Sequence, residues 1–448
     1  MAPLPAAATV PANLSLTVTG SPAGGAFLED AIRGAVDRAI RPTLRPGASM
    51  RFGPIVPWPI PPLAAGERMA VAVSVTVAGD AQTAWVTGVT TVDVTNVPTM
   101  RAAPSVLLLS DDPEYVQSDG PVFRGRVEPG KSARLYYYHS NIGLPRDIDV
   151  LLTAQTAARV HVIQSRGGPD RDVMAVGHAV SRDFLLREQQ NEGTIVNLVP
   201  GAPYVVRHDL MLQGELVAGA VDVSVLGGGP VGVAVVASPA GGTPAAYLSL
   251  PRVPFDGHRR HGAFELDGFG ELSATYTVGG PDAAVRYGGA HPSPKNVDPS
   301  DAGRDLGDYG IVHRVTFTLV NPTDAAVPVY LYEKPLGGPV RSTFFVDGQM
   351  KEVGCARLAQ PYWFMTYQLA PHSSAASTTL TMTDGGSYYP IEFGVSATPP
   401  VAYTPPVGSA DGCSPLPTPS PSPVPTQPPT PEPPSPPASP AATATPGG

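Results

Sequence analysis

Cysteine and charge are both scarce in this sequence. Two of the 448 residues are cysteine, and charged residues make up 15% of the chain, against 48 glycines and 55 prolines. So few cysteines exclude a disulfide framework or a cysteine-rich zinc site as the basis of the fold. Little charge combined with many glycines and prolines favours short strands joined by tight turns over long solvated helices.

Basic residues are especially few. The net charge is −9, and only 4 lysines accompany 25 arginines, which are scattered along the chain. A nucleic acid therefore finds no basic stripe to bind, and an electrostatic membrane anchor lacks its cluster of cations. The most apolar window, Leu216 to Val236, is interrupted by Asp222 and by a Gly-Gly-Gly-Pro turn, so no membrane span is expected. Residues 1–10 lack the charged and apolar regions of an intact secretion signal.

The short motifs of common enzymes are missing. The sequence has no Gly-x-Ser-x-Gly, His-Glu-x-x-His or Cys-x-x-Cys, and its glycine clusters are typical of turns. The close histidine pair, His258 and His261, flanks Arg259 and Arg260, whose charges repel a metal cation. We therefore expect no catalytic residues, no organic cofactor and no enzymatic activity.

What the sequence does contain is an internal repeat. Strand-like segments recur in the same order in both halves and end in matching Gly-Gly-Pro triplets. The matched segments are 133–137 with 283–287, 148–152 with 315–319, 160–163 with 327–330, and 167–169 with 337–339. Two copies of one all-β module are the expected organisation.

The N-terminal part has a different pattern. Alternating valines from Val71 to Val77, a turn at Gly79-Asp80 and the run from Trp85 to Val97 predict a hairpin with one buried face. Apolar residues at helical spacing from Leu28 to Ile40 predict a helix covering that face. A second helix is expected over Ser181 to Glu192.

These patterns define a mainly β chain. The expected parts are a disordered N-terminus (1–12), a β-rich domain with one helix (13–100), a first β-sandwich module (104–250), a linker (251–262), a second module (263–399) and a disordered Pro-rich tail (400–448). From Ser414 onward the tail holds 15 prolines and a single charged residue, Glu432, which predicts an extended polyproline-like spacer.

The loop from His291 to Gly310 has no counterpart in the first copy. Loops on a rigid β-scaffold commonly carry recognition, and four carboxylates in this one offer the hard oxygen ligands that calcium prefers. These residues are Asp298, Asp301, Asp305 and Asp308. A solvated acidic loop is the alternative, and the same choice applies to the acidic stretch from Asp111 to Asp119.

Aromatic residues and the two cysteines are the remaining candidates. Alternation along the strands leaves Tyr137, Trp363 and Tyr388 as candidates for exposed rings that stack on a sugar or on a partner protein. Cys355 and Cys413 either form a disulfide that ties the outgoing chain to the second module or remain two unrelated thiols.

Some stretches are similar to known sequences. The segments 134–141, 172–178 and 307–311, with the strand pattern from Val315 to Thr323, resemble uncharacterised bacterial secreted or surface proteins with tandem immunoglobulin-like β-sandwich modules. The resemblance implies that fold and an extracellular or cell-surface location, and it implies no ligand or activity. The expected function is that of a structural or adhesive protein. The alternative is a glycan- or protein-binding module, with or without calcium, that uses the loop 291–310.

Overall fold

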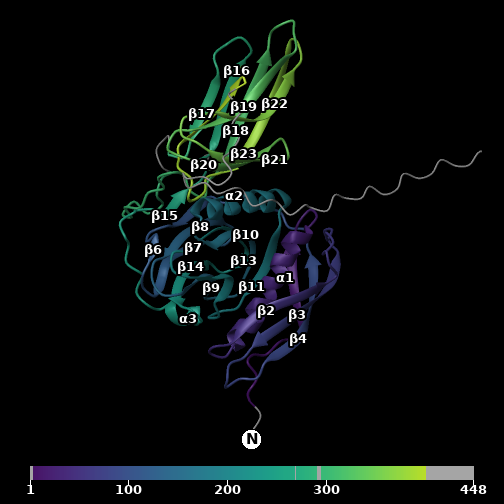
Figure 1. Ribbon diagram of the computed structural model, residues 1–448, viewed down its shortest axis with the longest axis vertical. Helices are drawn as coiled ribbons and strands as arrows, with labels where there is room; N and C mark the ends of the chain where they lie inside the picture. Colours follow the sequence, from purple (N-terminus) through teal and green to yellow (C-terminus); the bar gives the residue numbers. More distant parts are fainter. Residues whose placement is uncertain (1–3, 268, 290–293, 400–448) are drawn as a thin grey trace, which may run out of the picture. The chain divides into compact units, whose positions relative to one another are not determined.

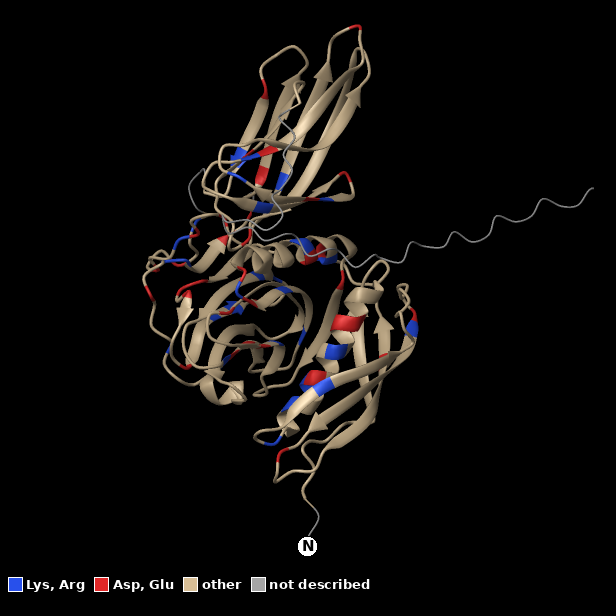
Figure 2. Ribbon diagram, in the orientation of Figure 1, with Lys and Arg blue, Asp and Glu red and all other residues tan. Residues whose placement is uncertain are grey.

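The computed structural model describes residues 4–267, 269–289 and 294–399 (Figure 1). They form a mainly β protein with several sheets, as the composition predicts. Figure 2 shows acidic and basic residues interspersed along the ribbon. No helix in the described ranges has the length and apolar character that a membrane crossing needs.

The N-terminal part is a four-stranded sheet covered by one helix. The elements are β1 (Asn13–Thr19), α1 (Gly25–Ile40), the short 3-10 helix η1 (Arg41–Thr43), β2 (Ser49–Val56), β3 (Arg68–Ala78) and β4 (Val86–Asn96). Apolar residues of α1 such as Leu28 and Ile32 share one buried core with Val71, Val73 and Val75 of β3. The helix and the hairpin therefore form where the apolar spacing predicts them.

The N-terminal sheet is continuous with the next one. β1 pairs in parallel with β4 and antiparallel with β11 (Gly193–Leu198), where Val18 lies opposite Thr194. Residues 4–12, expected to be disordered, also lie against this sheet. Ala7 and Ala8 are buried, and the N–H of Ala7 donates to the carbonyl of Ala84. Methyl burial and backbone hydrogen bonds hold this segment in place.

Residues 105–239 form two sheets that pack face to face. One sheet has the order β5-β8-β13-β10-β11 and the other the order β12-β9-β14-β7. Their facing side chains, among them Leu135 and Val150, form one buried core. The remaining bounds are β5 (Val106–Ser110), β6 (Tyr115–Val116), β7 (Gly120–Val127), β8 (Ser132–Asn141), β9 (Arg146–Ala154), β10 (Ala158–Asp170), α2 (Val173–Gln190), β12 (Tyr204–Met211), β13 (Leu216–Gly228) and β14 (Val231–Pro239).

Residues 271–396 form a second pair of sheets around their own core. Their orders are β16-β18-β23-β20-β21 and β17-β24-β19-β22, and Phe317 and Phe393 meet edge to face between them. The bounds are β16 (Glu271–Thr277), β17 (Ala283–Tyr287), β18 (Val312–Asn321), β19 (Val327–Pro335), β20 (Val340–Val346), β21 (Gln349–Ala356), β22 (Tyr362–Leu369), β23 (Ser373–Met382) and β24 (Ile391–Ser396). The short helix α3 (Pro244–Tyr247) and strand β15 (His261–Glu265) lie between the two pairs in the chain.

The two pairs of sheets have the same strand order. If β5 is matched with β16 and β7 to β14 with β17 to β24, every neighbour in the first pair has its counterpart in the second. The parallel pairing of β5 with β8 recurs as the parallel pairing of β16 with β18. The other matched pairings are antiparallel in both copies.

The segment-by-segment match made from the sequence is wrong by one strand. Residues 133–137 lie in β8, whereas residues 283–287 form β17, the counterpart of β7. Gly167 lies near the end of β10, but Gly337 precedes β20, so the two Gly-Gly-Pro triplets occupy different positions. Alternating apolar residues look alike in neighbouring strands, so the pattern shows that strands recur without showing which strand matches which.

Each pair carries its own insert. Helix α2 lies between β10 and β11, where the second pair has a turn at Asp347-Gly348. Conversely, residues 288–311 join β17 to β18, where the first pair has only residues 128–131. α2 begins earlier than expected, because Asp172, not Ser181, caps it and accepts from the N–H of Ala175. It ends at Asn191, in the left-handed conformation.

One asparagine performs the same task in both pairs. Asn141 at the end of β8 donates from Nδ2 to the carbonyl of Met211, the last residue of β12, at 3.1 Å. Asn321 at the end of β18 donates to the carbonyl of Leu369, the last residue of β22, at 3.2 Å. The Oδ1 of each accepts the backbone N–H two residues later, from Gly143 and Thr323.

We expect Asn141→Ala and Asn321→Ala each to lower the free energy of unfolding by about 1–3 kcal/mol, because each change leaves buried carbonyls without their donor. Urea unfolding followed by circular dichroism measures the loss. Asn197→Ala, at an exposed position of β11, is the control and should unfold like the unchanged protein. A loss in only one of the two buried variants would contradict the equivalence of the two positions.

Candidate functional site

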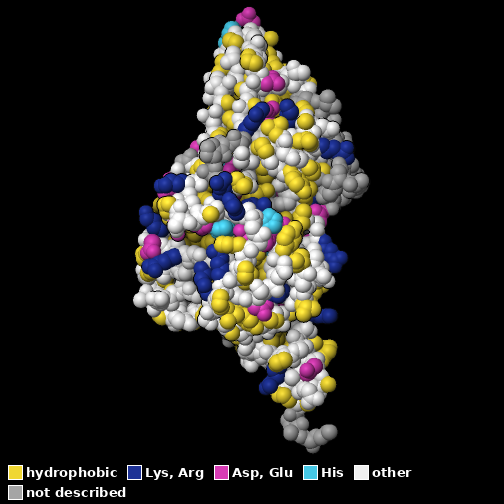
Figure 3. Space-filling view, turned by 90° about the vertical axis from the view of Figure 1, so that its left-hand side faces the viewer, with side chains coloured by type: hydrophobic (Ala, Val, Ile, Leu, Met, Phe, Trp, Pro, Cys, Tyr) yellow, Lys and Arg dark blue, Asp and Glu magenta, His cyan; other side chains and the backbone are white. Residues whose placement is uncertain are grey.

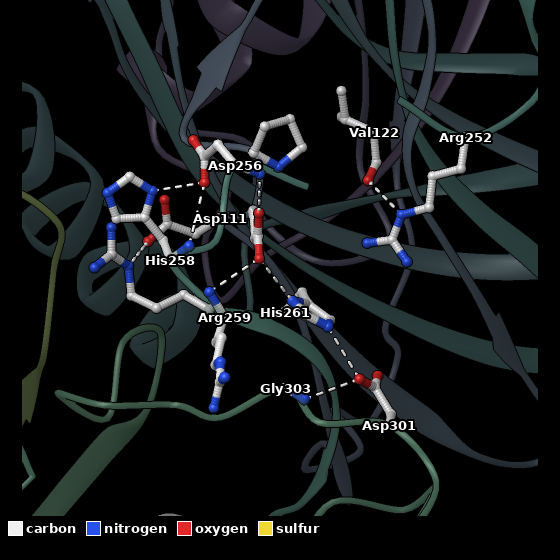
Figure 4. Close-up of polar contacts among 12 residues, drawn as sticks. Asp111, Val122, Arg252, Asp256, His258, Arg259, His261, Asp301 and Gly303 are labelled. Atoms are coloured by element: carbon white, nitrogen blue, oxygen red, sulfur yellow. Dashed lines mark hydrogen bonds and ion pairs between the residues drawn. The ribbon is translucent and has the colours of Figure 1, made fainter. Parts of the chain in front are cut away.

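Three polar segments from distant parts of the chain meet at the start of β15. They are the acidic stretch after β5, the linker 251–262, and the loop that joins β17 to β18 (Figure 4). β15 pairs with β5 so that His261 lies opposite Ser110, which fixes the linker beside the acidic stretch. In the space-filling view of this side, histidine side chains lie among basic, acidic and hydrophobic ones (Figure 3).

His261 is the centre of this cluster. Its Nδ1 lies 3.1 Å from Oδ2 of Asp112, and its Nε2 lies 3.0 Å from Oδ1 of Asp301. Phe255 stacks on the ring at a centroid distance of 3.9 Å, and the guanidinium of Arg252 lies over Phe255. A carboxylate oxygen therefore faces each ring nitrogen of His261.

Asp112 holds the backbone of the linker. This residue is 1% exposed, and it accepts the N–H of Asp256 at 2.8 Å and the N–H of Arg259 at 2.9 Å. Together with His261 it is a carboxylate with three donors, which compensates for its burial. The linker between the two pairs of sheets is thus fixed by side chains rather than left free.

A second set of ion pairs surrounds the first. Arg260 bridges Asp111 and Glu114, and His258 contacts Asp256 at 2.6 Å. Burial raises the pKa of Asp111 well above its usual value, although Arg260 opposes that effect. Burial alone would raise the pKa of Asp256. Hydrogen bonds from the N–H of Tyr115 and from the His258 ring outweigh that effect and lower the pKa to about 2. The cluster is therefore a network of hydrogen-bonded charges.

The four carboxylates proposed as calcium ligands have separate partners. Asp298 is exposed and bonds to Ser300, and Asp301 pairs with His261. Asp305 and Asp308 are fully buried, and they accept backbone N–H groups from Tyr309 and from Gly288. Among the described residues, no group of three or more His, Cys, Asp or Glu is arranged to hold a metal ion. The structure does not bring the four together.

The three aromatic candidates differ in how far their side chains are exposed. Tyr137 is 1% exposed and belongs to the core between the first two sheets, so its proposed exposure is wrong. Both faces of β8 are covered, since Tyr136 and Tyr138 pack on the other side with α2. Trp363 is 40% exposed and meets Tyr330 edge to face, and Tyr388 is 57% exposed. Only the last two remain available as surface rings.

Cys355 is buried beside Met174 of α2, and its sulfur is held in a disulfide. Cys413, its expected partner, lies outside the described residues, as does the Pro-rich tail. The pairing of the two remains a prediction.

A cavity of about 260 Å³ lies near the C-terminal end of α2. Its walls include Arg134, Glu188, Glu271, Arg314 and Phe269. The cations here already have carboxylate partners, because Arg134 pairs with Glu188 at 3.0 Å and Arg314 with Glu271 at 3.4 Å. Such paired charges do not select a ligand of one sign.

Sequence patterns pointed to most residues of the cluster around His261, but they did not predict that these residues lie together. Asp112 belongs to the acidic stretch, His261 to the close histidine pair and Asp301 to the loop of carboxylates, and each of these patterns is visible in the sequence by itself. Phe255 had no signal at all, because a single aromatic residue in a linker is common. The contact between His261 and Asp301 spans forty residues and depends on the pairing of β15 with β5.

Comparisons with known proteins do not identify this chain. No family model matches the sequence, and no curated protein matches it. Among solved structures, tripeptidyl peptidase 2 is matched over 76% of this chain at 9% identity with a TM-score of 0.16, and the chain spans 27% of that protein. A multi-copper oxidase from Pseudomonas parafulva is matched over 57% of this chain and 50% of its own length at 11% identity, with a TM-score of 0.12. One from Pseudomonas thermotolerans is matched over 83% and 92% at 10% identity, also with a TM-score of 0.12. Similarities this low carry no argument about fold or function.

We expect His261→Ala to loosen the linker. The change removes the partner of Asp301 and the ring beneath Phe255, at a local cost of about 2 kcal/mol, which corresponds to a roughly 30-fold larger population of the open linker. Limited trypsin digestion should then cut faster after Arg259 and Arg260. His372→Ala is the control, since His372 is exposed and pairs only with Asp324 at the surface. Equal cutting rates in both variants would show that His261 does not hold the linker.

Proposed function

We propose that this chain is a non-enzymatic structural protein, secreted or displayed at a cell surface. In this proposal its two pairs of sheets are tandem immunoglobulin-like β-sandwich modules that arose by duplication. The observation that carries the proposal is the identical strand order of the two pairs. Asn141 and Asn321 support it at the level of single residues, because each ties the end of one strand to the corresponding strand of the opposite sheet.

The immunoglobulin-like class is supported by the way the chain changes sheets. The consecutive strands β8 and β9 lie in different sheets, and so do the consecutive strands β13 and β14. Their counterparts in the second pair, β18 with β19 and β23 with β24, change sheets in the same way. Such crossings characterise Greek-key sandwiches. The parallel pairing of the first strand, β5 with β8, is a departure from the fully antiparallel arrangement.

A structural role is supported by the number of contacts that fix one module to the next. The cluster around His261 holds the linker, and Leu380 and Met382 of β23 share a buried core with Phe184 of α2. The charged side chains of the cluster around His261 pair with one another. The Pro-rich tail would then act as a spacer.

Three measurements on the full chain test the proposal. Differential scanning calorimetry should give one cooperative transition, because rigidly joined modules unfold together; two well-separated transitions would contradict the rigid joint. Antibodies against the chain should detect it in the culture medium or on intact cells that produce it, and detection only inside the cells would contradict the location. Turnover of any compound in a panel of hydrolase and oxidase substrates would contradict the non-enzymatic role.

A further inference from the structure

Helix α2 contacts the second module through an unusually close backbone approach. A Cβ atom on Gly177 of α2 would lie 1.8 Å from the carbonyl oxygen of Gly385, and one on Gly386 would lie 2.4 Å from the carbonyl of Val173. Only glycine allows this approach. The loop 383–386 after β23 therefore lies directly on the helix that is inserted in the first module.

Asp384 is the carboxylate at this contact. It is completely buried, and its Oδ2 accepts a hydrogen bond from Oγ of Ser181 on α2 at 2.8 Å. The N–H of Gly385 donates to the hydroxyl of Tyr136 on β8 at 2.6 Å, and the N–H of Asp384 donates to the hydroxyl of Tyr389 at 3.0 Å. The acid thus lies in an interface made of elements from both modules.

The surroundings of Asp384 oppose its charge more than they favour it. Burial raises the pKa of Asp384 to about 7, while Ser181, Ser387 and the charge of Arg341 act in the other direction. Other ionisable groups beside it are Glu333, Tyr136, Tyr287, Tyr309 and Tyr389, none of which supplies a positive charge.

One ion pair and one further polar contact cross the same interface. Nη2 of the buried Arg341 on β20 lies 3.9 Å from Oδ2 of Asp172, the cap of α2. Nε2 of His178 on α2 lies 2.8 Å from Oε1 of Glu352 on β21, and Arg182 also acts on Glu352. The attraction between Arg341 and Asp172 acts whether or not Asp384 is ionised.

We propose that the contact between α2 and the loop 383–386 is a pH-sensitive latch: a protonated Asp384 holds the second module on α2, and a rise in pH releases the loop because the released, hydrated Asp384 ionises first. The reason is the difference in environment. In the latched state the carboxylate is out of water, whereas in the released state it is hydrated and has an ordinary acidity. Between the ordinary pKa of 3.8 and the latched-state pKa of about 7, each pH unit therefore favours release by up to tenfold, and above pH 7 the effect levels off.

Hydrogen exchange of the full chain tests the latch. Mass spectrometry should follow peptides covering α2 and residues 380–389 between pH 4 and pH 9. Exchange rates are compared between variants at the same pH, because intrinsic exchange also accelerates with pH. We expect Asp384→Asn to exchange nearly as the unchanged protein does at pH 4 and more slowly at pH 9, by up to about 1000-fold. Equal rates at pH 9 would overturn the proposal.

Two controls distinguish the effect of Asp384 from that of other acidic residues. Asp324→Asn, at a fully exposed carboxylate of the second module, should leave the profile unchanged. The comparison is repeated in a Glu333→Gln background, because Glu333 is buried in the second module itself.

If Asp384→Asn does not fold, Ser181→Ala gives an independent answer. Removing the donor penalises the ionised acid in the latched state, so exchange should rise at pH 9 and stay unchanged at pH 6. No difference at either pH would also overturn the latch. Small-angle scattering reports whether the whole module moves, since release should increase the radius of gyration at pH 9 in the unchanged protein but not in Asp384→Asn.

Discussion

Replacing Arg134 by leucine should lower the free energy of unfolding by about 3–5 kcal/mol, because the change leaves the buried Asp222 without its cation and removes one of the two arginines that pair with the buried Glu188. Arg134 on β8 is 2% exposed. Its Nε donates to Asp222 of β13 at 2.7 Å, and its Nη2 donates to Glu188 of α2 at 3.0 Å. Its Nη1 donates to the carbonyl of Gly310 at 3.3 Å, and its guanidinium lies over Phe184. One side chain thus connects two strands, the inserted helix and the inserted loop.

Chemical denaturation with urea measures this loss. The matched control is Arg126→Leu, because Arg126 and its partner Glu128 are both more than half exposed and such surface pairs contribute about 0–1 kcal/mol. A double change, Arg134→Leu with Asp222→Leu, should recover part of the lost stability, since it removes one of the orphaned charges as well. If Arg134→Leu unfolds at the same urea concentration as Arg126→Leu, the ion pairs of Arg134 do not stabilise the fold.

The second large effect is a loss of stability as the pH rises, which Glu333→Gln should remove. Glu333 of β19 is fully buried, and burial raises its pKa from 4.5 to about 8, with Ser342 acting against the shift. Between these two pH values the folded protein holds a proton that the unfolded chain has released. The stabilisation is fully present below pH 4.5 and is lost as the pH rises through 8.

The expected loss is about 1.4 kcal/mol per pH unit and on the order of 5 kcal/mol in total. Asp384 also lowers the stability as the pH rises, between pH 3.8 and about 7. Unfolding free energies from urea titrations at pH 5, 6, 7 and 8 give the slope. Glu333→Gln should flatten the slope and be more stable than the unchanged protein at pH 8. Glu271→Gln, at an exposed position of β16, serves as the control and should keep the original slope.

The outer face of β8 illustrates why the fold was easier to predict than its surfaces. Alternation correctly separates Leu135 and Tyr137 from Tyr136 and Tyr138. We expected the side chains on one face of β8 to be exposed. That prediction is wrong, because one face lies in the core between the sheets and α2 and the second module cover the other. Periodicity assigns side chains to faces, and it contains no information about what later packs on a face.

The cluster around His261 shows the same limit for a polar site. Its acidic stretch, its histidine pair and its loop of carboxylates were each recognised separately. Whether they bind calcium, remain in solvent or pair with each other depends on distances that the sequence does not contain. Strand β15 decides the outcome by placing the linker along β5, which puts His261 between Asp112 and Asp301.

By itself the sequence determined the mainly β class, the helix over the N-terminal hairpin, the recurrence of strands in two halves and the position of the inserted loop. These features follow from local periodicity and from turn residues, which act over a few neighbouring positions. Only the tertiary structure decided which strands correspond, which tyrosines are covered and which charges meet across the two modules. Those outcomes depend on long-range packing, where a contact such as that of Ser181 with Asp384 joins residues that share no local pattern.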